Sequence, residues 1–420
     1  MISDAALRRV LPAPAVALLG DLIRWTAWGL VFVVWAAFAQ VYLRMIHLTL
    51  TEPAKSDFTI FYYTARFVRD GLPMYGLSPT RYGIAWAADH LGNLNPPHFQ
   101  LVAAPLAWLT YGQALLAWVA VNLAGLALGL TIIARELGIG WSWPRFWLWG
   151  AFTLSLAPFT TVAVTSEMTF LLLVPCALAW SAWRRGRWGR AGAWLGLCAS
   201  VKLFLLLFVP WLIWQRRWRA VGAFAAAVSA ACALGAAVYG VESYGQWLST
   251  LRRVGWWWLP MNASWQGMTS RVFQGGASIA PLLVRPSIVP AVALAGSGAI
   301  ALGALLASSR EAGPAQGDDR TFLVLLLGAI LASPLGWVYY IPLAYGPVLG
   351  WAGAGHGWVP LKALGRSRLV MAGSGAALLY VPHEATFAGQ PSGVASMTIA
   401  SVYFWGTLLL WLTLAADSRR

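Results

Sequence analysis

Charged side chains are scarce in this sequence. They make up 10% of its 420 residues, against roughly 25% in an ordinary soluble domain, while apolar residues reach 59%. Six long blocks contain no Asp, Glu, Lys or Arg at all: Trp25–Leu43, His98–Ala134, Ala220–Val241, Pro286–Ser309, Thr321–Leu361 and Ala385–Ala416. A spanning helix needs about 20 mostly apolar residues, and a buried helix of a soluble protein would explain one block but not six. The sequence predicts an all-α polytopic membrane protein, with residues 1–420 as a single integral membrane domain.

Cysteine and histidine are also rare. The three cysteines, Cys176, Cys198 and Cys232, lie in apolar stretches, and their odd number and spacing indicate neither a disulfide framework nor a zinc site. The five histidines are scattered along the chain. We therefore expect neither a metal nor another cofactor.

Basic residues give the chain a net charge of +15, and their positions decide what this charge means. Arg184–Arg190 and Arg216–Arg219 are basic clusters directly beside apolar blocks. This pattern is typical of cytoplasmic loops rather than of a nucleic-acid-binding surface. Basic residues also precede the first predicted helix, Leu22–Leu43, and end the chain, so both termini are predicted to be cytoplasmic. The protein is expected in a bacterial inner (plasma) membrane, with about 12 passes.

Cytoplasmic positions are likewise predicted for the connection Ser309–Arg320 and for the basic stretch Lys362–Arg368. Two other connections are predicted on the outer face, residues 44–97 and residues 242–280. In the first, Ser56 is a good N-cap residue and is followed by apolar residues at helical spacing until Gly71. Asp57–Asp70 is therefore predicted to be a short amphipathic helix on the outer membrane surface.

The stretch Ala191–Gln215 lies between the two basic clusters and carries Lys202 in its middle. If both clusters are cytoplasmic, this stretch must enter the membrane and return, but it is too short for two full spans. Two half-length helices meeting near Lys202 fit best. Irregular backbone at that depth requires a covering of protein or water, which predicts an internal cavity.

Three ionisable residues are candidates for chemistry. Asp57 starts the predicted outer helix, where it is either a functional carboxylate or only a helix-starting acid. Lys202 lies within an apolar run, where a charge costs a few kcal/mol unless it is paired or solvated. Snorkelling to the surface is the alternative for Lys202. Glu167 either faces the same cavity or caps a local turn.

Three consecutive tryptophans lie in the second predicted outer connection. Trp256–Trp258 form either an interfacial aromatic belt or a platform for sugars.

Taken in order, five segments resemble glycosyltransferase family 87, the polyprenol-phosphate-mannose-dependent mannosyltransferases of the GT-C superfamily. They are Ser56-Asp57-Phe58 continuing to Tyr75, Pro96-Pro97, Val201–Phe204 continuing to Arg219, Asn262–Gly267, and Ser333–Trp337. This chain has Ser166-Glu167 where the family often has Gly-Gln, and Tyr339-Tyr340 where histidines often follow the last segment. Both departures fall on presumed substrate contacts.

The resemblance implies a GT-C-type bundle of about 12 helices with short amphipathic helices in the first outer loop. It implies inverting transfer of a sugar, mannose by family preference, from a polyprenyl-phosphate donor to a glycolipid or glycan acceptor on the outer face. Asp57 is then the general base, and the donor phosphate is bound by Lys202, Arg66 and Arg81. The residues predicted to contact substrate are Tyr62, His98, Glu167, Asn262, Trp265, Trp337 and Tyr340.

Two other functions share the same hydropathy. A transporter or lipid flippase of envelope glycolipid assembly would also contain broken helices, although the chain shows none of the internal repeats common in transporters. A non-catalytic subunit of an envelope-assembly complex is the third possibility. Both alternatives would tolerate loss of the Asp57 carboxylate, whereas an enzyme that uses it as a base would not.

Overall fold

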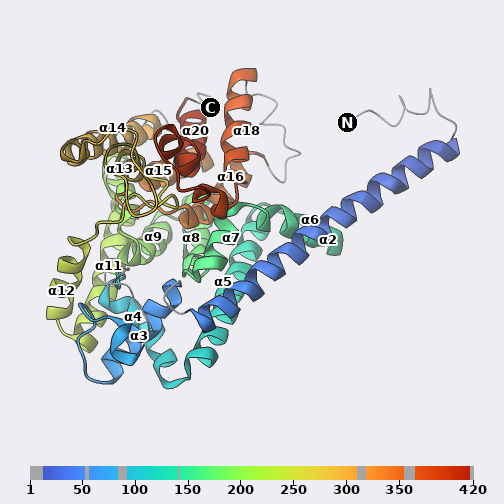
Figure 1. Cartoon of the computed structure of the whole chain (residues 1–420). Helices are drawn as coiled ribbons and strands as arrows, with labels where there is room; N and C mark the ends of the chain where they lie inside the picture. Colours follow the sequence, from blue (N-terminus) through green and yellow to red (C-terminus); the bar gives the residue numbers. More distant parts are fainter. Residues whose placement is uncertain are drawn as a thin grey trace.

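Helices carry the whole architecture. The computed structural model describes residues 13–52, 56–83, 92–140, 142–309, 318–353 and 365–416, and in these ranges the chain forms helices and loops without a β-strand beyond two isolated bridges. The prediction of an all-α chain is confirmed. Figure 1 shows the helices gathered into one body, from which the long helix α2 (Ala13–Thr51) extends to one side.

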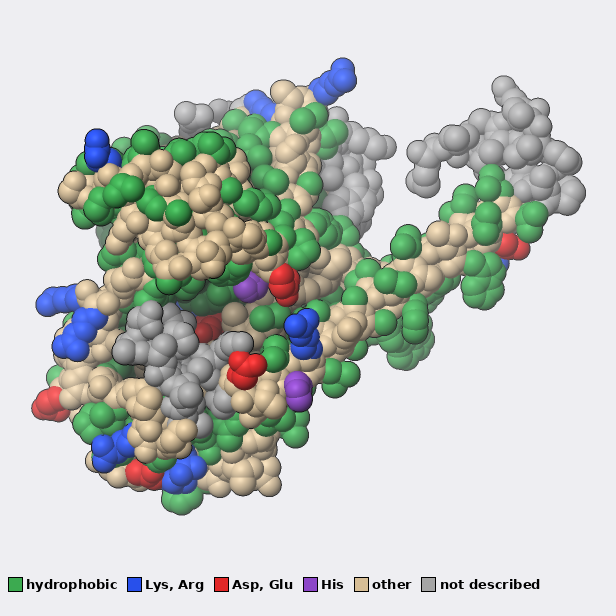
Figure 2. All heavy atoms as spheres, viewed as in Figure 1, with side chains coloured by type: hydrophobic (Ala, Val, Ile, Leu, Met, Phe, Trp, Pro, Cys, Tyr) green, Lys and Arg blue, Asp and Glu red, His purple; other side chains and the backbone are tan. Residues whose placement is uncertain are grey.

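Five helical segments of the described residues are long and apolar enough to cross a membrane, and they lie at Leu18–Thr51, Tyr111–Glu136, Trp218–Tyr239, Pro286–Ser308 and Val394–Ala415. They correspond to most or all of α2, α5 (Tyr111–Glu136), α11 (Trp218–Tyr239), α14 (Val289–Ser309) and α20 (Val402–Ala415). The pair α6 (Trp143–Leu154) and α7 (Ala157–Thr165), bent by 75°, makes a sixth if counted as one. Apolar side chains cover the exposed length of α2 (Figure 2), as expected for a lipid-facing helix. These helices identify a multi-pass membrane protein.

Five or six spans are fewer than the predicted 12, because the remaining apolar sequence is divided into shorter helices. These are α8 (Thr169–Arg184), α9 (Trp188–Val201), α10 (Phe208–Trp214), α15 (Asp319–Ala332), α16 (Tyr345–Trp351) and α18 (Arg366–Leu378). Breaks such as the 3-10 turn Val338–Ala344, with Pro342 inside it, interrupt apolar blocks that hydropathy alone treats as continuous.

The stretch around Lys202 forms the predicted hairpin of half-length helices. Helix α9 ends at Lys202, and the chain returns through the 3-10 turn Leu203–Leu207 into α10. Trp183, at the end of α8, stacks on Trp211 of α10 with ring centroids 4.7 Å apart and meets Trp188 of α9 edge-on at 5.0 Å. Both ends of the hairpin therefore lie beside the same end of α8, which confirms the prediction that the chain enters and comes back.

Two glycines allow the backbones of α9 and α11 to touch. A Cβ atom at Gly192 would lie 2.1 Å from the carbonyl oxygen of Ala220, and one at Gly196 would lie 2.4 Å from that of Phe224. Small residues at such contacts are typical of helix pairs in membranes. The register shows that the two helices run parallel, so the basic clusters preceding them lie at one end of the molecule, as the positive-inside pattern requires.

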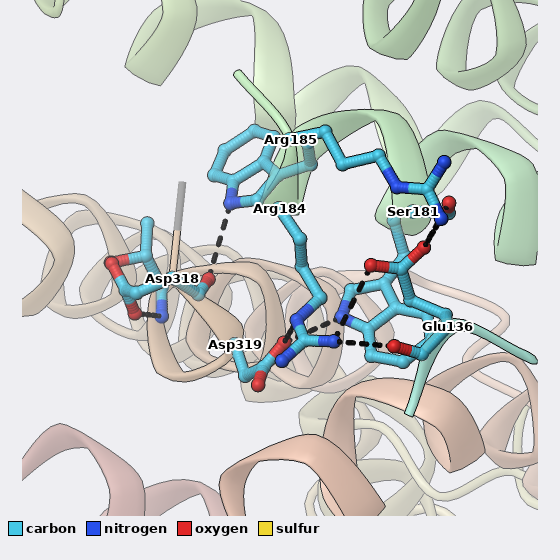
Figure 3. Close-up of polar contacts among 9 residues, drawn as sticks. Glu136, Ser181, Arg184, Arg185, Asp318 and Asp319 are labelled. Atoms are coloured by element: carbon cyan, nitrogen blue, oxygen red, sulfur yellow. Dashed lines mark hydrogen bonds and ion pairs between the residues drawn. The ribbon is translucent and has the colours of Figure 1, made fainter. Parts of the chain in front are cut away.

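A network of charges joins three helices at that same end (Figure 3). The Nε atom of Arg184 lies 3.1 Å from Oδ1 of Asp319 at the start of α15, and its Nη1 lies 3.5 Å from Oε1 of Glu136 at the end of α5. Arg185 contacts the second oxygen of Glu136 at 2.7 Å. The network ties the ends of α5, α8 and α15 together.

Several predictions on topology concern residues outside the described ranges. Most of the predicted cytoplasmic connection Ser309–Arg320 falls in residues 310–317, which are not described. The first part of the basic stretch Lys362–Arg368 falls in residues 354–364, which are not described either. The two ends of the chain, residues 1–12 and 417–420, also lie outside the described ranges, so the predicted orientation of the termini is untested.

Helix α3 (Asp57–Arg69) forms where the sequence predicts it. The Ser56 hydroxyl accepts a hydrogen bond from the backbone N–H of Phe58, and Gly71 follows with a φ of 71°. Its surroundings differ from the prediction, because nine of its thirteen side chains are buried. Helix α3 packs against α5 and against the turns η3 (Pro97–Phe99), α4 (Gln100–Ala103) and η4 (Ala104–Trp108) instead of resting on a membrane surface with one face exposed.

The other short elements are η2 (Pro79–Tyr82), α12 (Glu242–Leu251), α13 (Trp265–Phe273), η6 (Pro286–Ile288), η8 (His383–Thr386), α19 (Val394–Met397) and η9 (Ile399–Ser401).

Candidate functional site

A cavity of about 860 Å³ opens among several segments of the chain. They include one face of α3, residues 74–79 and 92–94, the end of α7, the chain that follows α12, and the aromatic stretch at 337–339. Its walls include Asp57, Tyr63, Arg253, Trp256, Trp258 and Trp337. An acid, a cation and several aromatic rings thus line one cavity. This combination suits a polar ligand that contains a ring able to stack on an aromatic side chain.

Asp57 enters this wall because α3 begins there. The hydroxyl of Ser56, just before it, donates to the carbonyl oxygen of Thr165 at 3.3 Å and so fixes the start of α3 to the end of α7. Burial, followed by the negative charge of Glu167, raises the pKa of Asp57 to about 7, although the charge of Lys202 acts in the opposite direction. A carboxyl with a pKa near neutrality is suited to accept a proton from a hydroxyl during a reaction.

Lys202 and Glu167 form an ion pair beside Asp57. The Lys202 ammonium lies 2.8 Å from Oε1 of Glu167 and donates to the Asn95 side-chain oxygen at 3.2 Å. It also lies 5.2 Å from the centre of the Tyr340 ring. The side chains of Lys202 and Glu167 are only 10% and 3% exposed, so the pair is buried and largely neutralised. The structure thus brings Asp57, Glu167, Lys202 and Tyr340 of the predicted site together, and of these four only Asp57 is among the described residues that line the cavity.

A strained turn positions Glu167. Ser166 ends α7 with a φ of 54°, in the left-handed region that costs a residue with a side chain on the order of 1 kcal/mol. Trp118 holds the turn by donating to the Ser166 carbonyl oxygen at 2.8 Å. The resemblance pointed to glycine as frequent at this position, and glycine adopts this backbone conformation without strain.

Trp337 lies in the cavity wall, as predicted, and stacks on Trp256 with ring centroids 5.7 Å apart. Asn262 supports this wall from behind and is fully buried. Its side-chain nitrogen donates to the carbonyl oxygens of Trp257 and Pro334 at 3.0 and 2.9 Å. Its oxygen accepts from the backbone N–H groups of Ser264 and Gly336. Asn262 therefore joins two loops and has no free polar atom to offer a sugar.

The other residues predicted to contact substrate are not among the described residues that line the cavity. Trp265 donates to the carbonyl oxygen of Val292 at 2.9 Å and packs on α14. Tyr62 donates to the carbonyl oxygen of Leu109 at 2.9 Å. His98 shares a hydrogen bond of 3.0 Å with the hydroxyl of Tyr244.

The predicted phosphate ligands are also outside the lining of this cavity. Arg66 donates to the hydroxyl of Tyr62 at 3.1 Å and lies over the ring of Tyr82. Arg81 is exposed on η2. Tyr339, noted in the sequence as a departure from the family at a presumed substrate contact, lines the cavity, and sequence reasoning missed Arg253, which also lies in its wall. The signal for Arg253 was a basic pair just before the three consecutive tryptophans. In the described part of the chain, no group of three or more His, Cys, Asp or Glu residues is arranged to hold a metal ion.

Comparison with known proteins gives this cavity a family context. A protein of Mycolicibacterium smegmatis (strain ATCC 700084 / mc(2)155), named polyprenol-phosphate-mannose-dependent alpha-(1-2)-phosphatidylinositol pentamannoside mannosyltransferase, is 29% identical over 286 residues. The similarity covers 64% of this chain and 66% of that protein, just under two thirds of its length. No solved structure matches the chain significantly. Residues 93–334, more than half of the sequence, match the family described as glycosyltransferase family 87. The chain therefore belongs to glycosyltransferase family 87.

Proposed function

We propose that the protein transfers a mannosyl group from polyprenyl-phosphate mannose to a hydroxyl of a glycolipid or glycan on the outer face of the membrane. Membership of the family and the activity for which the Mycolicibacterium relative is named support the donor and the sugar. The observation that carries the proposal is the Asp57 carboxyl, which lies in the wall of an 860 Å³ cavity beside stacked tryptophans and has a pKa of about 7.

The proposed reaction is a single inverting displacement. Asp57 takes the proton of the acceptor hydroxyl, for which its carboxylate must come within about 3 Å of that oxygen. The acceptor oxygen then forms a bond to the anomeric carbon of mannose from one side, while the bond from that carbon to the phosphate oxygen breaks on the other. The bonding electrons leave with the phosphate. Polyprenyl phosphate is released, and its phosphate gains one negative charge.

Each wall of the cavity has a part in this proposal. Trp337 is stacked between Trp256 and Tyr339, and it supports Trp256, whose other face is the one proposed to receive a sugar ring. The Lys202–Glu167 pair lies next to Asp57 and adjusts its proton affinity, since the two charges act on the carboxyl in opposite directions. Tyr340 lies against Lys202, behind the wall that contains Asp57.

We also propose a GT-C-type arrangement of twelve membrane segments. The glycine contacts show α5 parallel to α8 and α9 parallel to α11, so an odd number of segments lies between the members of each pair, and the hairpin contributes two of the twelve as half-length segments. The segments are α2, α5, α6 with α7, α8, α9, α10, α11, α14, α15, η7 (Val338–Ala344) with α16, α18 and α20. In this topology the end that carries Arg184 and both basic clusters is cytoplasmic, and so are both termini. The cavity, residues 44–97 and residues 242–280 then belong to the outer face of a bacterial inner membrane.

The test is transfer of radiolabelled mannose by the purified protein from polyprenyl-phosphate mannose into envelope lipids. The variant Asp57→Asn removes the base but keeps the size of the side chain, and it is expected to lower the rate by at least ~10²-fold. Asp70→Asn is the matched control, because Asp70 follows the other end of α3, where it binds Arg69 and Tyr82 outside the cavity. Equal rates for wild type and Asp57→Asn would refute the base. No transfer by wild type from this or other lipid-phosphate sugars would favour a flippase.

A further inference from the structure

Arg253 is a cation in the cavity wall that the predicted mechanism does not use. It follows α12 by two residues, and its backbone N–H donates to the carbonyl oxygen of Thr250 at 3.0 Å. Arg253 and Thr250 both line the cavity that Asp57 lines. The side chain of Arg253 is exposed. None of the ion pairs formed within the described ranges includes it, so its guanidinium is available to a ligand.

The three cations predicted to bind phosphate are less available. Lys202 is held by Glu167 at 2.8 Å and by Asn95 at 3.2 Å, and a phosphate at its ammonium would have to compete with a buried carboxylate. Arg66 is bound to the hydroxyl of Tyr62. Arg81 is exposed on η2 and is not among the described residues of the cavity wall.

We propose that Arg253 binds the phosphate of the lipid-linked sugar donor and neutralises the charge that this phosphate gains when the sugar leaves. The inference rests on the proposed transfer reaction and adds the residue that receives the leaving group. Trp256 follows Arg253 by three residues and lines the same cavity, so one short segment of the wall contributes both an aromatic ring for the sugar and a cation for its phosphate. Asp57 belongs to a different segment of the wall, so the proton acceptor and the proposed phosphate ligand come from separate parts of the chain.

The chemistry favours an arginine at this position. The donor is a phosphodiester with one negative charge, and the released lipid is a phosphomonoester that carries up to two, with a second pKa near 6. A guanidinium binds two phosphate oxygens through parallel N–H groups, and the bonds strengthen as the charge grows. The contact is therefore stronger to the leaving phosphate than to the intact donor, which is the requirement for accelerating the reaction.

The experiment measures binding of polyprenyl phosphate and of uncharged polyprenol to the full-length protein in detergent. Wild type is expected to prefer the phosphate, and Arg253→Gln to lose on the order of 10- to 100-fold of phosphate affinity, the contribution of a charge-assisted hydrogen bond. Arg253→Lys should recover part of the loss. Arg252→Gln is the matched control, because Arg252 is an exposed neighbour outside the lining of the cavity. Thermal unfolding of each variant verifies that it is folded.

Three results would overturn the inference. Unchanged phosphate affinity in Arg253→Gln removes Arg253 from the site, and a loss in Lys202→Met alone assigns the phosphate to Lys202. A dependence on Arg253 for phosphatidylinositol or inorganic phosphate, but not for polyprenyl phosphate, assigns the contact to a different phosphate. This assay contains no sugar, so it separates the two proposals. If wild type transfers no mannose but its phosphate binding depends on Arg253, the proposed reaction fails and the phosphate site stands.

Discussion

Asp57 makes the reaction rate dependent on pH near neutrality. Only the ionised carboxylate can accept a proton, and burial together with the charge of Glu167 raises the pKa of Asp57 to about 7. One pH unit below that value, about one tenth of the carboxyl remains ionised, so kcat/KM at pH 6 is expected to be roughly 10-fold below its plateau. The measurement is mannose transfer at subsaturating donor concentration between pH 5 and pH 9, because kcat/KM reports the free protein.

The variant Glu167→Gln identifies the origin of this dependence. The substitution removes the negative charge of Glu167, which raises the pKa of Asp57. It also leaves Lys202 without its ion-pair partner, and the positive charge of Lys202 lowers the pKa of Asp57. Both effects act in the same direction, so the acid limb of the profile is expected to move to lower pH. An acid limb that moves to higher pH, or a wild-type rate that is flat from pH 5 to pH 9, would refute this account of Asp57.

The other predictions concern stability. Burial raises the pKa of Asp57 from 3.8, so the stability contributed by its protonated form is lost as pH rises from 3.8 to about 7, and Asp57→Asn should melt at a higher temperature than wild type at pH 8. Asn262→Ala leaves the buried backbone N–H groups of Ser264 and Gly336 without their acceptor and is expected to lower the unfolding free energy by about 2 kcal/mol or more, which detergent unfolding curves can measure. Gly192→Val should prevent contact between α9 and α11 and give aggregated protein on size exclusion, whereas Gly189→Val meets open space and should not.

Local patterns predicted the parts of the structure that depend on neighbouring residues. Ser56 and Gly71 bound α3 because capping and left-handed turns are decided within a few residues. The hairpin at Lys202 followed from length, since 25 residues between two basic clusters cannot cross twice. The proximity of Asp57, Glu167 and Lys202 agrees with the general rule that charges within apolar sequence find partners.

Tertiary contacts decided what the sequence could not predict. Asn262 belongs to a segment that resembles the family, but its bonds to residues 334 and 336 make it a structural joint, and such distant pairing leaves no local pattern. Trp265 turns toward α14 for the same reason. Arg253 looked like an ordinary loop cation, because only the folded chain brings it to the wall that contains Asp57. The number of full-length membrane spans could not be predicted from hydropathy, because a break at a proline is tolerated only where other parts of the protein cover the exposed backbone.

The hairpin also has a consequence for how this protein is made. In the proposed topology the hairpin places Lys202 inside the membrane, where a lysine costs about 2.5–3.5 kcal/mol during insertion, so the hairpin would insert poorly on its own. Its acidic partner, Glu167, precedes it by 35 residues, and Asn95 precedes it by 107. At ordinary rates of translation, Glu167 leaves the ribosome roughly 2 to 7 s before Lys202. The order of the chain thus makes the carboxylate of Glu167 available before the ammonium of Lys202 is inserted. A rearranged gene that placed the hairpin first would lose this advantage during biogenesis.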